Sequence, residues 1–338
     1  MIPLAVLSGA FTIMNGTISL GQFALNNPAE RTLPLQLEST RMWPAFAEEL
    51  NQDVGIDITG GLMVAENAIQ IEYLEKKIGM ERALGINVEL ISKGELRDLA
   101  PVVAEHLIGA SWCPDEGKID PLVSTQAVLS NALKVGVRLH KQTNVLDITR
   151  RNGRFAVMTS RGCYTAPKIV NAAGGWSSAI ASMVGINLPI RGHPIQIIVT
   201  EPIPHMLDQL LAYAGRHLTL KQVANGNLLI GGGWPSGLDP ATSRPAVTQK
   251  SFEGNLWVAQ RAVPMLQQIH VIRSWAAMNV KADGAPILGE CKQVPGFYHA
   301  VSVNGITLGP LIGQMTAEAI RTESNVPGME SLTVERFR

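Results

Sequence analysis

The sequence predicts an α/β protein in which an α+β segment interrupts a parallel α/β domain. Alternating strand and helix patterns occur at both ends of the chain and in its middle, as in a parallel sheet covered by helices. Between residues 186 and 277, short strand patterns follow one another with hairpin turn signals, as in an antiparallel layer. The length of 338 residues is enough for about two such domains.

The first part of the chain carries the helix signals. Apolar residues at i, i+3, i+4 and i+7 from Trp43 predict a helix, and we expect Pro34 and Pro44 to bend or divide that segment. Ser92 and Glu95 have the spacing of a capping box, which predicts a helix start. Further helices are expected at 67–84, with Glu72 and Lys76 as an i,i+4 pair, and at Pro121–Leu133; strands are expected at Leu4–Leu7 and Leu62–Ala65.

The remaining chain is richer in strands. Asn152–Gly153 and Asn225–Gly226 are hairpin turn signals between strand patterns. Helices are expected at Trp176–Met183 and Gly309–Arg321. The expected strands are Val137–His140, Val145–Thr149, Phe155–Thr159, Lys168–Ala172, Pro194–Thr200, His217–Val223, Leu228–Gly231, His270–Ala277 and Phe297–Ser302.

Composition excludes several classes of protein. Lys and Arg number 28 against 28 Asp and Glu, which argues against a nucleic-acid or acidic-membrane binder that works by bulk electrostatics. Charged residues are 17% of the chain, so much apolar surface must be buried in cores or interfaces. Cys113, Cys163 and Cys291 have no metal-ligand spacing and form no disulfide framework. No apolar run is long enough to span a membrane, so we expect a soluble enzyme of a reducing, cytoplasmic compartment that holds no metal.

Three glycine-rich turns carry most of the chemical information. The first, Asn15–Ser19, offers backbone N–H and hydroxyl donors to a phosphate, although a plain turn explains it equally. The second, Val170–Trp176, ends a buried strand with small residues, which allows a ligand to approach the backbone or simply allows tight packing. The third, Ser302–Pro310, leads from a strand into a helix N-terminus, which suits an anion or carbonyl oxygen or is an ordinary N-cap.

These turns and further motifs resemble the D-amino-acid oxidase-like family of FAD-dependent oxidoreductases over almost the whole chain. The segments Gly16–Ser19, Gly60–Ala65, Pro114–Pro121, Val170–Trp176, Trp275–Ala276 with Asp283–Gly289, Gly305–Pro310 and Glu335–Phe337 resemble motifs of that family in the family's order. The resemblance to Val-Asn-Ala-Ala-Gly-x-Trp at Val170–Trp176 is the most specific.

The resemblance implies a fold and a cofactor. The expected fold is a Rossmann-like FAD-binding domain of the glutathione-reductase type, N-terminally incomplete, with an inserted α+β antiparallel-sheet substrate domain. The FAD-binding domain would comprise 1–50, 92–185 and 275–338, and the substrate domain 51–91 and 186–274. The family normally begins with a Gly-x-Gly-x-x-Gly unit, which this sequence lacks near its start, with Ser8 where an acidic residue would follow. The chain is therefore expected to be a fragment, to have a misplaced start, or to have lost the pyrophosphate cradle.

The resemblance also implies a reaction: hydride transfer from the carbon next to an amine nitrogen to flavin N5, followed by hydrolysis of the imine. Many relatives have an Arg after the Trp-Ala pair that binds the substrate carboxylate. Here Asn279 and Lys281 follow Trp275, and they provide a hydrogen-bond donor and a charge without the bidentate fork of Arg. An opine or another N-substituted amino acid therefore becomes a more plausible substrate than a simple D-amino acid.

The predicted site residues follow from these motifs. We expect catalytic roles for Asn279, Lys281, Tyr213 and Lys221, and we add Arg216 and His217 as substrate-side candidates. His193 is left out because it stands in a turn before a strand. The predicted FAD-contacting residues are Gly16, Thr17, Ser19, Val145, Ala172, Ala173, Gly174, Trp176, Asn304, Gly305, Ile306, Thr307 and Leu308.

Two other functions stay open at this point. Without a pyrophosphate cradle, the chain would serve as a flavin-free or degenerate scaffold subunit of a heteromeric dehydrogenase. The alternative to a cytoplasmic location is a peripheral position at the membrane through a partner. An NAD(P)-dependent dehydrogenase needs a complete dinucleotide fingerprint, which is absent. We expect a small-molecule amine or amino acid as the ligand, homo- or hetero-oligomeric partners and no nucleic acid.

Overall fold

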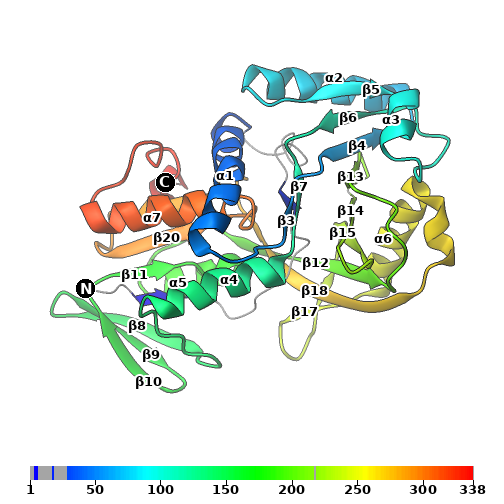
Figure 1. Cartoon of the computed structure of the whole chain (residues 1–338). Helices are drawn as coiled ribbons and strands as arrows, with labels where there is room; N and C mark the ends of the chain where they lie inside the picture. Colours follow the sequence, from blue (N-terminus) through cyan, green and yellow to red (C-terminus); the bar gives the residue numbers. More distant parts are fainter. Residues whose placement is uncertain (1–3, 7–16, 19–28, 217, 338) are drawn as a thin grey trace.

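The computed structural model describes residues 4–6, 17–18, 29–216 and 218–337. Figure 1 shows an α/β arrangement in which a small sheet with α5 and α7 lies on one side and a large sheet with α2, α3 and α6 on the other. The helix α4 (Pro121–Lys134) and the strands β3 (Ile56–Asp57) and β7 (Gly117–Ile119) lie between them in this view.

The small sheet has the order β1–β11–β20–β19. Its strands are β1 (Leu4–Val6), β11 (Ile169–Asn171), β20 (Phe297–Val301) and β19 (Ile287–Glu290). The first three strands are parallel and β19 is antiparallel, which confirms the parallel element predicted from the βα alternation. One face packs into a core with Ile180 and Ala181 of α5 (Ser177–Ser182), and the other packs against α7 (Gly309–Thr322).

The large sheet has eight strands in the order β18–β12–β15–β14–β13–β4–β6–β5. Every pair is antiparallel except β13 with β4, so the predicted antiparallel layer is confirmed. The strands are β4 (Gly61–Ala65), β5 (Glu89–Ser92), β6 (Gly109–Cys113), β12 (Arg191–Thr200), β13 (Leu210–Tyr213), β14 (Thr219–Gln222), β15 (Leu228–Pro235) and β18 (Val271–Lys281).

Helices divide between the two faces of the large sheet. Leu96 of α3 (Lys93–Leu99) and Val258 of α6 (Gln249–Ala262) share one core with Leu220 of β14. Leu74 of α2 (Ala68–Ala83) and Leu33 of α1 (Ala29–Leu50) share a different core with Met63 of β4. The two cores lie on opposite faces because Met63 alternates with Leu62 and Val64 along the strand.

Three smaller sheets complete the fold. They are β2–β7–β3, with β2 at Thr17–Ile18; β10–β9–β8, formed by β8 (Val145–Arg151), β9 (Arg154–Thr159) and β10 (Gly162–Ala166); and β16 (Gly237–Leu238) with β17 (Pro245–Ala246). Short 3-10 helices stand at η2 (Gly174–Trp176), η3 (Pro264–Gln268) and η4 (Val334–Phe337).

Sequence predictions that depend on residues close together in the chain are confirmed by the structure. The Ser92–Glu95 capping box has both of its hydrogen bonds. Lys76 Nζ lies 2.7 Å from Glu72 Oε1 on α2. Asn152 and Gly153 have φ of 50° and 73°, the left-handed values that a tight hairpin between β8 and β9 requires.

One element prediction is wrong, and of the two outcomes expected for Pro34 and Pro44, bending or division, division does not occur. Residues 137–140 form no strand, and Val137 is 44% exposed, because no described strand lies beside them to complete a ladder. The prolines at 34 and 44 do not divide their segment, since α1 continues through both. Packing explains this continuity, because Leu33 and Trp43, the neighbours of the two prolines, are almost fully buried.

The predicted domain boundaries stay a prediction. The strand β6 lies within the range 92–185 assigned to the FAD-binding domain, yet it pairs with β4 and β5 in the large sheet. Among the described helices, none is long and apolar enough to cross a membrane.

Candidate active site

The second and third glycine-rich turns lie next to each other. Because β11 and β20 are adjacent parallel strands, their carboxyl ends reach the same edge of the small sheet. The turn at 172–176 follows β11, and the turn at 302–308 follows β20. The edge of a parallel sheet where such turns meet is where α/β proteins bind ligands.

The turn after β11 is fixed by a buried side chain. Asn171 is fully buried; its Nδ2 donates to the carbonyl of Ser177 at 2.9 Å, and its Oδ1 accepts from the N–H of Ala173 at 3.3 Å. Gly174 has a φ of 54°, and a Cβ added to it would meet no atom within 4 Å. Ala173 is fully buried, whereas Ala172, Gly174 and Trp176 stay half-exposed beside this open space.

The turn after β20 is held by α1. Trp43 Nε1 donates to the carbonyl of Ile306 at 3.2 Å, and Ser39 Oγ accepts from the N–H of Leu311 in the first turn of α7. The N-cap residue of α7, Leu308, provides no side-chain cap. Gly305 is exposed and a Cβ added to it would also meet no atom within 4 Å. This turn therefore presents open space in front of a helix N-terminus, where the macrodipole favours negative charge.

The first glycine-rich turn is described only in part. Thr17 and Ile18 form β2, which pairs with Lys118 and Gly117 of β7. Gly16 and Ser19, like Ser8, lie outside the described residues. The neighbouring strand β7 is buried along its length, so it forms the wall behind β2.

One face of the large sheet carries polar groups from several strands. In the β12–β18 ladder, Arg191 stands directly opposite Lys281 and His193 directly opposite Asn279, so all four side chains share one face. The register through β15 to β14 places Lys221 on that same face. Asn279 Oδ1 accepts from the N–H of Val280 at 2.8 Å, which leaves its Nδ2 as a donor. The structure thus places three of the four predicted catalytic residues, Asn279, Lys281 and Lys221, on one face of the sheet. Lys221 stands level with Val199 and Arg273, six residues along the strands from Asn279.

Strand β18 adjoins the turn after β11 through the backbone of Asn279 and the side chain of Met278, which alternates with Asn279 and therefore points to the opposite face of the sheet. A Cβ added to Gly175 would stand 3.1 Å from the carbonyl oxygen of Asn279 and 2.5 Å from Cγ of Met278. Strand β18 therefore touches the turn whose residues are predicted to contact FAD. Burial lowers the pKa of His193, and the nearby charge of Lys281 lowers it further.

Lys221 is fully buried on this face. Its Nζ donates to the carbonyl of Ile119 at 3.1 Å, and Ile119 belongs to β7, the strand that pairs with Thr17. Burial lowers the pKa of Lys221 to about 7; the charge of Lys118 lowers it as well, whereas Asp120 raises it. A lysine with this pKa exchanges a proton near neutral pH, which fits a group that assists proton transfer.

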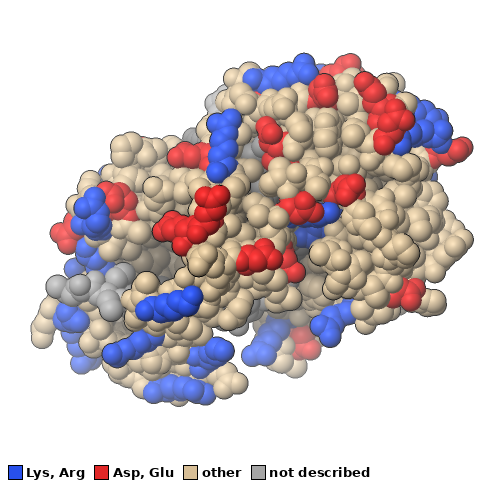
Figure 2. All heavy atoms as spheres, viewed as in Figure 1, with Lys and Arg blue, Asp and Glu red and all other residues tan. Residues whose placement is uncertain are grey.

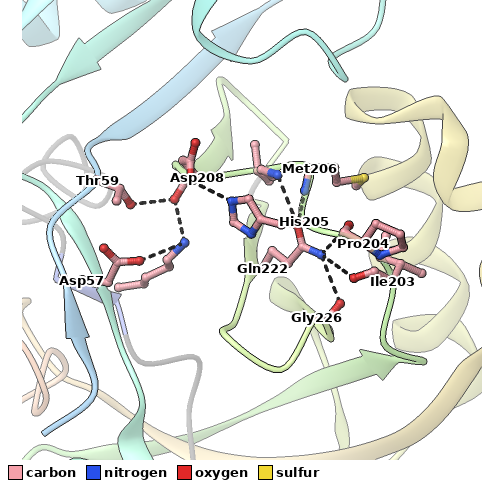
Figure 3. Close-up of polar contacts among 11 residues, drawn as sticks. Asp57, Thr59, Ile203, Pro204, His205, Met206, Asp208, Gln222 and Gly226 are labelled. Atoms are coloured by element: carbon pink, nitrogen blue, oxygen red, sulfur yellow. Dashed lines mark hydrogen bonds and ion pairs between the residues drawn. The ribbon is translucent and has the colours of Figure 1, made fainter. Parts of the chain in front are cut away.

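A polar network fixes β7 to the large sheet (Figure 3). Gln222 on β14 is fully buried; its amide group bonds the carbonyls of Ile203, Pro204 and Gly226 and accepts from the N–H groups of Met206 and Leu207. The loop held in this way presents the carbonyl of Asp208, which accepts from Thr59 Oγ1 at 2.6 Å and from Lys118 Nζ at 2.7 Å. Lys118 also lies 3.3 Å from Asp57.

Tyr213 lies away from this face. Its side chain packs with Leu211 and Leu220 in the core under α6, on the opposite face from Lys221. Its hydroxyl donates to Glu66 Oε2 at 2.7 Å, and Arg216 pairs with Oε1 of the same carboxylate. The catalytic assignment of Tyr213 and Arg216 therefore gains no support from the geometry. His217 lies outside the described residues, and Val145 begins β8 half-buried against the core below α5.

Sequence reasoning missed Arg191 and His193. Their position beside Lys281 and Asn279 follows only from the pairing of β12 with β18, because they stand 90 and 86 residues earlier in the chain than these partners. No local pattern marked them, because in Arg-Gly-His-Pro-Ile-Gln-Ile at 191–197 the positions of one strand face change from polar to apolar. Among the described residues, no group of three or more His, Cys, Asp or Glu side chains is arranged to hold a metal ion.

These surroundings fit the flavin end of FAD. Gly174 and Gly305 leave open space at the shared edge, the N-terminus of α7 faces it, and β2 adds a further wall. The backbone of residues 302–308 and the helix dipole would hold the electron-rich edge of the ring system. Residues 172–176 would hold its other side.

The fold and the open edge of the small sheet suit an α/β oxidoreductase with a flavin nucleotide at that edge. The family model "FAD dependent oxidoreductase" (DAO) matches residues 9–319, and the chain belongs to this family. The prediction of an FAD-dependent oxidoreductase is therefore confirmed.

Individual relatives agree with this assignment. The chain is 28% identical to a glycine oxidase of Geobacillus kaustophilus over 97% of this chain and 88% of that protein. It is 25% identical to one subunit of an opine oxidase of Agrobacterium tumefaciens over 88% of this chain and 80% of that protein. The crystal structure of glycine oxidase from G. kaustophilus superposes with a TM-score of 0.88 over 97% of this chain and 88% of that chain, at 24% identity, which shows the shared fold.

Proposed function

We propose that this chain binds FAD and oxidises an amine or amino acid at the carbon next to the nitrogen. The observation that carries the proposal is the polar face of the large sheet, formed by Arg191, His193, Lys221, Asn279 and Lys281. Its strand β18 touches the turn predicted to contact FAD. The relatives named above are oxidases of this kind by name.

The protein's own residues supply binding and proton handling. Bound FAD supplies the hydride acceptor. The substrate loses a hydride from carbon while the nitrogen lone pair forms the C=N bond, and water then hydrolyses the imine product. The amine must be neutral for this step, and Lys221, with its pKa near 7, is the buried group that we assign to hold or accept a proton on this face.

The substrate class follows from the donors on the same face. Asn279 Nδ2 and the Lys281 ammonium would bind the carboxylate of an amino acid, as a donor and a charge in place of an Arg fork. Arg191 and His193, which stand opposite Lys281 and Asn279 on the neighbouring strand β12, add two further side chains that can donate hydrogen bonds to the substrate. A substrate with a bulky or carboxylated nitrogen substituent, such as an opine, suits this extended set better than a simple D-amino acid.

The decisive experiment is a visible spectrum of the purified protein with FAD, followed by anaerobic addition of secondary amines and amino acids. We expect flavin absorbance that bleaches with N-substituted amino acids. A preparation without flavin absorbance after FAD is added would favour the scaffold alternative and overturn the proposal.

Lys281→Gln should raise the substrate concentration for half-bleaching about tenfold, whereas Lys250→Gln, an exposed control on α6, should leave it unchanged.

We also propose that the chain acts in the cytoplasm as part of a homo- or hetero-oligomer. The opine oxidase relative is by name one subunit of its enzyme, which supports an oligomer. Light scattering after size exclusion tests this, and a strictly monomeric protein at micromolar concentration that is fully active would contradict it.

A further inference from the structure

The basic residues of this chain are distributed unevenly although its net charge is zero. Residues 134–161 hold seven Lys and Arg and a single acid, Asp147, a net charge of +6 in a chain balanced at 28 against 28. The seven are all exposed: Lys134, Arg138, Lys141, Arg150, Arg151, Arg154 and Arg161. We call them the basic surface. In Figure 2 blue side chains gather over β8–β10 at the lower left, without red ones among them.

These cations have no acidic partners among the described residues. None of the seven forms an ion pair with a described carboxylate. Arg150 lies over the ring of Phe155 at 5.4 Å, and Arg161 donates to Gln142. Arg151 and Arg154 stand directly opposite each other at the tip of the β8–β9 hairpin. Like charges in such a pair repel, and an anion bound between them would remove the repulsion.

Apolar side chains are exposed within the basic surface. Leu146 is 59% exposed, Met158 49% and Val135 83%. Met158 shares one face of the sheet β10–β9–β8 with the Arg151–Arg154 pair, because it stands on β9 an even number of residues from Arg154. Asp147, the single acid, stands directly opposite Met158 on this face, which keeps an excess of positive charge. Cations mixed with exposed aliphatic side chains match a membrane surface, which offers anionic headgroups above a hydrocarbon layer. A nucleic acid would use the charges but not the aliphatic groups.

We propose that the basic surface binds membranes that contain anionic lipids. The Arg pair at the hairpin tip neutralises headgroup phosphates, and Leu146 and Met158 enter the interface between headgroups and acyl chains. Only Val145, a predicted FAD contact that precedes Leu146 on β8, adjoins this surface among the residues assigned to the active site, and the inference does not depend on the proposed reaction. The zero net charge excludes binding by bulk electrostatics but not binding through this one patch.

The test is co-sedimentation of the full-length protein, loaded with FAD, with vesicles. Vesicles of phosphatidylcholine alone are compared with vesicles that contain phosphatidylglycerol, at about 0.1 M and about 0.5 M salt, since screening weakens headgroup attraction. We expect binding to the anionic vesicles at low salt only. Arg151→Gln with Arg154→Gln should weaken that binding about twentyfold. The control, Lys250→Gln with Arg273→Gln, removes two exposed cations elsewhere and should bind as the original protein does.

A further variant separates lipid from other polyanions. Leu146→Ser should weaken vesicle binding severalfold and leave retention on heparin unchanged, because heparin has no hydrocarbon layer. Thermal melts confirm that each variant folds. Equal loss in the control and hairpin-tip variants, equal binding to neutral vesicles, or retention on heparin with no vesicle binding would each overturn the proposal.

Discussion

At the scale of single residues, Glu66 shows how distant segments converge on one buried charge. It follows β4 and is 8% exposed; Arg216, Arg261 and Tyr213 all bond its carboxylate, and His106 lies 3.5 Å away. Burial alone would raise the pKa of Glu66, but the hydrogen bonds from Arg216, Tyr213 and Arg261 lower it to about 2. The carboxylate of Glu66 thus connects the end of β4 with Tyr213 of β13 and Arg261 of α6.

Glu66→Gln should lower the free energy of unfolding at pH 7 by about 1–2 kcal/mol, because two arginines lose their shared partner. A carboxyl with a lowered pKa stabilises the fold above its unfolded pKa of about 4.5, and the gain disappears as the pH falls toward 2. Urea unfolding between pH 7 and pH 3 measures this. The original protein should lose stability on acidification more steeply than the variant, and Glu72→Gln on exposed α2 should keep the steep profile. Parallel profiles for Glu66→Gln and the original protein would contradict the assignment.

Lys221 should also make stability rise with pH, but at higher pH than Glu66, because burial of its charged form is a cost that disappears as the lysine loses its proton. Its pKa is about 7 when folded and about 10.5 when unfolded, so the unfolded chain binds more protons between these values and stability rises with pH there. Lys221→Met should remove this rise, so the variant gains relative stability at pH 7 and less at pH 10. Unfolding at pH 7, 8.5 and 10 measures it, with Lys76→Met as the exposed control. An unchanged rise in Lys221→Met would show that Lys221 is charged in the folded protein.

Sequence separation decides which of these residues could be predicted. The Ser92–Glu95 box was predictable because its partners stand three residues apart. Tyr213 and Arg261 stand 147 and 195 residues from Glu66, so no local pattern links them. Lys221 was predicted as a catalytic residue from the sequence, but its burial depends on β7, which comes about a hundred residues earlier and could not be foreseen from local pattern.

At the scale of elements, α1 matters to the site although it contributes no predicted cofactor residue. Its Trp43 and Ser39 hold the turn after β20 and the first turn of α7. The sequence predicted the apolar stripe of this helix, since Trp43 and Phe46 share a core with Val54 and Ile119. It did not reveal the hydrogen bond to Ile306, which lies 263 residues away.

Trp43→Phe should weaken FAD binding about three- to tenfold, because the turn at 302–308 loses the indole N–H that fixes its carbonyl. Quenching of flavin fluorescence on titration measures the dissociation constant. Trp257→Phe, a change at a 51% exposed Trp on α6, is the control and should not alter it. If both variants bind FAD as the original protein does, the turn does not depend on α1.

The segment 137–140 shows why an element pattern can fail. Its alternation of apolar and polar residues is that of a strand, yet a strand exists only when a neighbouring strand accepts its hydrogen bonds. Lys168–Ala172 and Phe297–Ser302 have similar apolar runs and do form strands, because β11 and β20 pair with each other. The residue pattern therefore predicts which segments can form a strand, and a neighbouring strand in the folded protein decides whether they do.

At the scale of the whole molecule, the sequence predicted a parallel and an antiparallel sheet. It did not predict which segments of the chain pair within the large sheet. The large sheet joins β4, β5 and β6 to strands more than 70 residues later through the parallel pair β4–β13. The carbonyls of Ile119 and Asp208 link β7 to the same sheet through Lys221 and Lys118. Because β7 also pairs with β2 beside the predicted flavin site, the large sheet and the FAD site are connected through one buried strand.

FAD binding should therefore stabilise both sheets together. When the free FAD concentration is a hundred times the dissociation constant, binding adds about 2.7 kcal/mol to the free energy of unfolding. The gain applies to every segment that unfolds together with the site. Hydrogen exchange in mild denaturant can follow peptides from β20 and from β14 separately. We expect both to gain protection, since unfolding β14 removes the contact of Lys221 with β7. Lys118→Met, which removes the bond to Asp208, should reduce the gain in β14 and keep it in β20, whereas Lys250→Met should change neither. Protection confined to β20 in the original protein would show that the two sheets unfold independently and that β7 does not couple them.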